Sequence, residues 1–107
     1  MSRKLVVVLA LVVTLVVASS TAAFAKGVVR IPSLKFKPAN ISVSKGEKVV
    51  WKNTDDVGHN VSSTSSNWSK NTNVASGART SFTFKKKGTF KYKCAIHPSM
   101  TGKVQVG

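Results

Sequence analysis

The sequence predicts a small all-β protein, folded as an antiparallel β-sandwich in a single domain. Apolar and polar residues alternate with a period of two in several short runs, and glycines and prolines separate these runs. No segment of the expected mature chain keeps the 3.6-residue period of a helix. The 107 residues are enough for one small domain, and short strands with regular turns favour two packed sheets.

The first 25 residues are expected to be a signal peptide rather than part of the domain. The basic start Ser2-Arg3-Lys4 precedes an apolar run, residues 5–18, and Ala23-Phe24-Ala25 supplies an A-x-A cleavage pattern. We therefore expect export to the periplasm or the extracellular space, with cleavage after Ala25 and a mature domain of residues 26–107. An uncleaved membrane anchor is the alternative, although the run is short for a spanning helix.

The first half of the mature chain contains four strand candidates. They are bounded by Pro32, Pro38 and Gly58, and Lys45-Gly46 gives a turn before the third. In that third run Val49 and Trp51 share one face, as a half-buried strand requires. The four runs are residues 28–31, 41–43, 48–52 and 59–62.

The second half begins with a polar segment, residues 62–77, rich in Ser, Asn and Thr. It is expected to form a long loop or a poorly formed edge strand. Alternating runs return at 81–85, 90–94 and 103–106. In the second of these Phe90, Tyr92 and Cys94 point to one face, so Cys94 is predicted at the inner end of a strand.

Every residue of the mature chain that offers sulfur or imidazole belongs to one short set. Cys94, His97 and Met100 form a C-x-x-H-x-x-M loop, and His59 lies 35 residues upstream on another predicted strand. Each residue alone is ordinary, since a lone Cys or Met usually fills a core and a lone His seldom binds a metal. Together they make the His₂Cys set with a weak Met that suits copper in both its oxidation states.

These residues also carry a family resemblance. Gly58-His59-Asn60-Val61, followed by residues 92–100, resembles the copper site of cupredoxins of the amicyanin and plastocyanin kind, and the short span from His97 to Met100 is similar to amicyanin. The resemblance implies a Greek-key sandwich, one blue copper ion cycling between Cu(I) and Cu(II), and one-electron transfer between larger redox proteins. It also implies that the Asn60 amide ties the His59 strand to the Cys94 loop.

Composition narrows the function further. Residues 26–107 carry 15 Lys and Arg but three acids, a net charge of +12, too few acids for paired-carboxylate catalysis. We expect a non-enzymatic, monomeric electron carrier that docks on acidic redox partners or associates with an anionic envelope surface. Copper buffering or delivery outside the cytoplasm is the alternative. Nucleic-acid binding is disfavoured by export and by the lack of a recognition motif.

Overall fold

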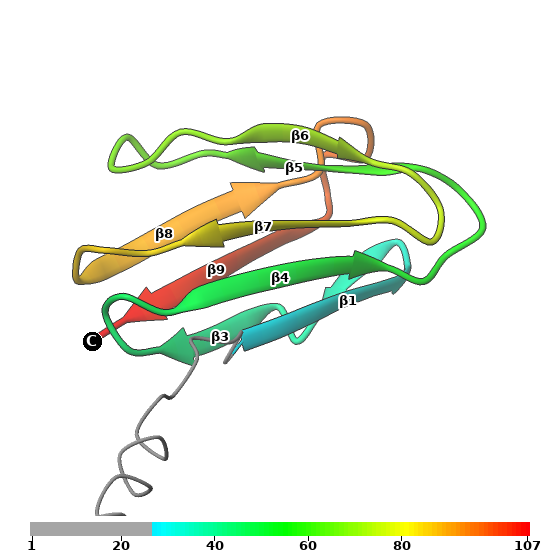
Figure 1. Ribbon diagram of the computed structural model, residues 1–107. Helices are drawn as coiled ribbons and strands as arrows, with labels where there is room; N and C mark the ends of the chain where they lie inside the picture. The colour runs from blue at the N-terminus through cyan, green and yellow to red at the C-terminus, as the bar shows by residue number, and fades with distance from the viewer. Residues whose placement is uncertain (1–26) are drawn as a thin grey trace, which may run out of the picture.

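The computed structural model describes residues 27–107, which form a sandwich of two β-sheets (Figure 1). The expected signal peptide and its cleavage site lie outside these residues. Within the described residues no helix is long and apolar enough to cross a membrane. The strands are β1 (Gly27–Ser33), β2 (Lys35–Lys37), β3 (Asn40–Val43), β4 (Lys48–Asn53), β5 (His59–Ser63), β6 (Asn71–Val74), β7 (Arg79–Thr83), β8 (Gly88–Lys93) and β9 (Thr101–Val106).

The strand order confirms the predicted all-β sandwich and refines its pairing. One sheet has the order β2-β1-β4-β7 and the other β3-β9-β8-β5-β6, so the chain crosses between sheets several times. The sheets are not wholly antiparallel, because β1 pairs with β4 and β3 with β9 in parallel. Parallel neighbours need a crossover connection, which local alternation in the sequence does not reveal.

The inner faces of the strands form one apolar core, as the alternation predicts. Val49 and Trp51 on β4 are fully buried, and so are Phe90 and Tyr92 on β8, at 4% and 1% exposure. The Trp51 and Tyr92 rings pack edge to face with centroids 5.4 Å apart. Burial raises the pKa of Tyr92 to about 12, so its hydroxyl stays neutral at physiological pH.

The polar segment of residues 62–77 contains a strand after all. β6 lies at the edge of the five-stranded sheet and pairs with β5 from His59↔Val74 to Ser62↔Asn71. Only Val74 of its four residues is buried. An edge strand with one wet face buries little, which explains its weak sequence signal and agrees with the edge-strand alternative.

Candidate metal centre

Cys94 follows the last residue of β8, at the end of the sandwich where the loop of residues 94–100 turns back into β9 (Figure 1). The alternation of β8 continues to this residue, so its side chain points inward and is fully buried. Two backbone hydrogen bonds close the loop: Cys94 N donates to Met100 O at 3.0 Å, and Met100 N to His97 O at 2.9 Å. The loop is therefore compact, and it holds three of the predicted ligands.

The fourth predicted ligand reaches this loop because of the register between β5 and β8. Ser62 pairs with Lys93, the last residue of β8, so the first residues of β5 extend past the end of β8. His59, the first residue of β5, consequently lies beside the loop, and its side chain is buried at 1% exposure. The ring centroids of His59 and His97 are 5.0 Å apart.

Three candidate ligand atoms converge here. The side chains of His59, Cys94 and His97 each offer one ligand atom, and these atoms lie within 4.8 Å of one another. His97 Nδ1 is 3.6 Å from Cys94 Sγ. His59 Nδ1 is buried and has no hydrogen-bond partner among the described residues. A buried, unpartnered imidazole nitrogen beside a thiol costs free energy unless something binds it, so the site fits a soft transition metal such as copper.

Met100 completes the group by position. It is 2% exposed, and its backbone pairs with those of Cys94 and His97. A thioether is a weak ligand that favours Cu(I), whereas imidazole suits both copper states. The structure thus places all four predicted residues at one end of the sandwich.

Sequence reasoning missed Asp55, which binds the far side of His59. Its Oδ2 lies 2.8 Å from His59 Nε2, so the carboxylate holds the ring with Nδ1 free for a metal. This hydrogen bond is the main cause that lowers the pKa of Asp55 below its ordinary value. The four-residue spacing from Asp55 to His59 was visible, but a loop gives that spacing no defined geometry.

Asn53 in turn fixes the loop that carries Asp55. This fully buried residue donates from Nδ2 to Val57 O at 2.8 Å and to Val74 O at 2.9 Å, and its Oδ1 accepts from Asp55 N at 2.9 Å. Two of these bonds lie within the turn between β4 and β5, and the bond to Val74 O reaches β6. The imidazole is therefore held by a chain of hydrogen bonds that begins on β4.

Asn60 ties the two halves of the site together, as the family resemblance implied. Its Oδ1 accepts from Ala95 N at 3.1 Å, in the Cys94 loop, and from Ser62 Oγ at 2.6 Å. Its Nδ2 donates to Asn71 Oδ1 and Asn73 Oδ1 on the edge strand β6. One buried amide thus links β5, β6 and the loop, which restricts how far the ligand atoms can separate.

Known proteins with similar sequences bind copper. Residues 23–107 match the family model described as copper binding proteins, plastocyanin/azurin family. The chain is 38% identical over 88 residues to plastocyanin of Solanum tuberosum, covering 69% of this chain and 89% of that protein. It is 33% identical over 82 residues to amicyanin-alpha of Methylorubrum extorquens, covering 73% of this chain and 69% of that protein.

Solved structures agree with the sequence matches. A purple cupredoxin from Nitrosopumilus maritimus superposes with a TM-score of 0.70 at 29% identity, covering 76% of this chain and 99% of that one. The reduced Cu(I) form of an amicyanin variant at pH 4 gives a TM-score of 0.73 at 33% identity, covering 84% and 89%. The fold and the ligand residues thus point to the same group of proteins.

Proposed function

Because the chain belongs to the plastocyanin/azurin family of copper-binding proteins, we propose that it is an exported, non-enzymatic carrier of single electrons between redox proteins. Copper supplies the one-electron couple between Cu(I) and Cu(II). The observation that carries the proposal is the convergence of His59 Nδ1, Cys94 Sγ and His97 Nδ1 at one end of the sandwich.

In this proposal His59, Cys94, His97 and Met100 hold the copper ion. His59 and Cys94 are buried, whereas His97 is half-buried and gives the site an edge at the surface. The hydrogen bonds that Asp55 and Asn60 accept hold His59 and the Cys94 loop in place. A site that rearranges little exchanges electrons quickly.

The surface around His97 is suited to brief contact with another protein. A small apolar surface surrounded by polar residues is typical of protein contacts. Three of the large exposed apolar side chains belong to loops at this end of the sandwich. They are Leu34 (61% exposed), Val57 (51%) and Ile96 (55%). We infer that electrons enter and leave through the exposed edge of His97.

The basic charge favours docking on acidic surfaces of redox partners or on an anionic envelope surface. It also favours a monomeric carrier. At a net charge of +12 for residues 26–107, approach to such a surface is accelerated electrostatically. The rate of electron exchange with an acidic partner should therefore fall steeply as salt rises. A rate that stays flat from low to high ionic strength would contradict the docking proposal. The signal peptide of residues 1–25 and a periplasmic or extracellular location complete the proposal.

The colour of the copper protein tests the proposed ligands. Purified residues 26–107 with one equivalent of Cu(II) should turn intensely blue, because the Cys94 thiolate donates charge to the metal. Cys94→Ser should remain folded and colourless. A folded wild-type protein that binds Cu(II) without colour would show that the thiolate is not a ligand.

Metal exchange separates electron transfer from copper delivery. A carrier of electrons should keep its copper through repeated oxidation and reduction, with a reversible one-electron wave in voltammetry. Copper that passes readily to a metal-free acceptor protein, with slow electron exchange, would instead favour delivery.

A further inference from the structure

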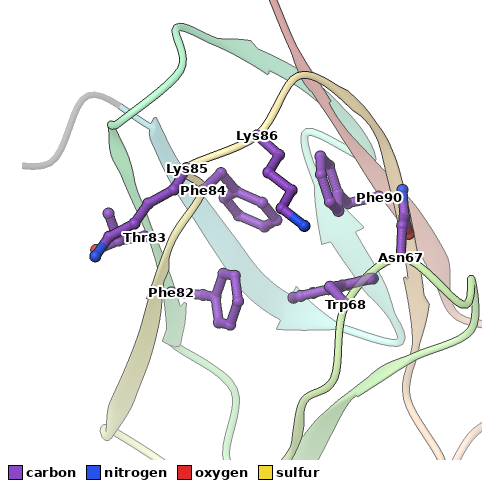
Figure 2. A pocket seen from close by; sticks show the side chains of 8 residues that line it. All are labelled: Asn67, Trp68, Phe82, Thr83, Phe84, Lys85, Lys86 and Phe90. Atoms are coloured by element: carbon purple, nitrogen blue, oxygen red, sulfur yellow. The ribbon is translucent and has the colours of Figure 1, made fainter.

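A cavity of about 230 Å³ opens between the two sheets at the end of the sandwich away from the metal centre (Figure 2). It lies where β7 runs into β8, beside the connection from β5 to β6. Four of the eight residues that line it are aromatic, and Figure 2 shows their rings gathered together with the Lys86 side chain over them. The aromatic residues are Trp68, Phe82, Phe84 and Phe90.

The walls of this cavity are well ordered by their contacts. Trp68 packs against Phe82 with ring centroids 5.1 Å apart and against Phe84 at 5.2 Å. Its Nε1 donates to Lys91 O at 2.9 Å, which fixes the indole plane. Phe84 and Phe90 pack at 4.9 Å. The rings pack directly against one another, and Phe82 remains partly exposed where the cavity lies over them.

The cavity has a positive rim. Lys85 and Lys86 line it and no acidic side chain does. Figure 2 shows the Lys86 ammonium extended over the space between the rings, whereas the Lys85 side chain points away from it. Among the residues that line the cavity, only these two lysines carry a charge.

We propose that this cavity binds a small organic anion with one flat ring and one carboxylate. The ring would lie over this aromatic cluster, against the partly exposed Phe82, and the carboxylate would meet the Lys86 ammonium. An apolar cavity of about 150 Å³ accommodates benzene. A cavity of about 230 Å³ therefore has room for one ring and its substituent. This proposal does not depend on the proposed electron transfer.

Benzoate titrated into the Cu(I) protein is the direct test, because the reduced protein is diamagnetic and gives sharp NMR spectra. Benzoate should shift the Trp68 indole signal along a saturating curve with a Kd of about millimolar, as a nine-atom ligand allows. Transfer of magnetisation from benzoate protons to the Phe82 ring should place the ligand in the cavity. Acetate, which has the charge but no ring, should leave the Trp68 signal in place.

Paired lysine variants test the role of the rim. Lys86→Gln should raise the benzoate Kd about three- to fivefold and leave binding of the neutral analogue benzamide unchanged. Lys85→Gln removes the same charge at a neighbouring residue and should leave both unchanged. Equal losses in the two variants would show that benzoate senses only the general positive field, and would overturn the proposal.

Other occupants would give different results. If vesicles rich in phosphatidylglycerol shift the Trp68 signal and benzoate does not, the cavity is a membrane contact and the proposal is wrong. If the signal shifts with protein concentration alone, a second copy of the chain occupies the cavity, and the proposal is equally wrong. Phe82→Leu, which keeps an apolar side chain but removes a ring, should weaken benzoate binding without changing the copper spectrum.

Discussion

His59 and His97 belong to one metal site but to two different kinds of structure. His59 begins a strand, is buried, and is held at Nε2 by Asp55 at 2.8 Å. His97 lies in the loop of residues 94–100, is half-buried, and its Nδ1 faces the Cys94 sulfur at 3.6 Å. One half of the site is thus fixed by the sandwich, and the other half is held by a short loop.

This difference assigns separate roles to the two halves. The buried half sets the position of the metal, because its donor atom is tied to strand β4 through Asp55 and Asn53. The exposed half connects the metal to the surface and is free to respond to solvent.

Replacing either histidine by glycine should give the largest difference between the buried half of the site and the loop half. His97→Gly should lose the blue colour and regain it with added imidazole, because the gap opens to solvent. His59→Gly should stay colourless, since the gap is buried beneath the loop. Visible absorption with and without imidazole measures both. Equal rescue of the two variants would show that His59 is as accessible as His97.

Removing the partner of His59 should weaken the fixed half. Asp55→Ala leaves Nε2 without its acceptor, and loss of such a partner typically costs 10- to 100-fold in metal affinity. Competition with a copper chelator measures the loss. Asp56→Ala is the matched control, because Asp56 carries the same charge in the same loop and its side chain is exposed. If the two variants lose the same copper affinity, the effect of Asp55 comes from its charge and not from its hydrogen bond to His59.

Breaking the link between the halves should cost stability. Asn60→Ala removes the hydrogen bonds that Asn60 Oδ1 accepts from Ala95 N and Ser62 Oγ, and each such bond contributes about 0.5–1.5 kcal/mol. That loss lowers the Tm of a domain this small by roughly 4–8 °C per kcal/mol. Asn73→Ala removes one exposed acceptor of the same network and should lower the Tm less. Thermal melting of the copper protein compares them.

Acid should change the reduction potential through the loop half of the site alone. This effect should be smaller than those of the substitutions above. Protons compete with Cu(I) for an imidazole that can leave the metal, and a released ring that is protonated favours the reduced protein. The reduction potential should then rise as pH falls, by at most about 59 mV per pH unit. A potential independent of pH, with both imidazoles still bound by NMR, would show that the loop is as rigid as the strand.

Asp55 should not contribute to this acid response until lower pH. Its folded pKa is lowered by the bond to His59, so the stability it adds is present above the ordinary carboxyl pKa. That stability is lost only as pH falls through the lowered folded value.

Local patterns in the sequence predicted the strands with a buried face and the residues of the metal site. Alternation placed Trp51, Tyr92 and Cys94 on the inner face because successive strand residues point to opposite sides. The candidate ligands were visible because residues 26–107 contain no other Cys, His or Met.

How distant segments meet depends on the folded structure. The parallel pairs β1–β4 and β3–β9, the hydrogen bond between His59 and Asp55 and the aromatic cavity all depend on contacts that no local pattern encodes. Period and composition describe which way a side chain faces. The partner that it meets is set by the pairing register and the packing of the two sheets, because these bring together residues far apart in the chain.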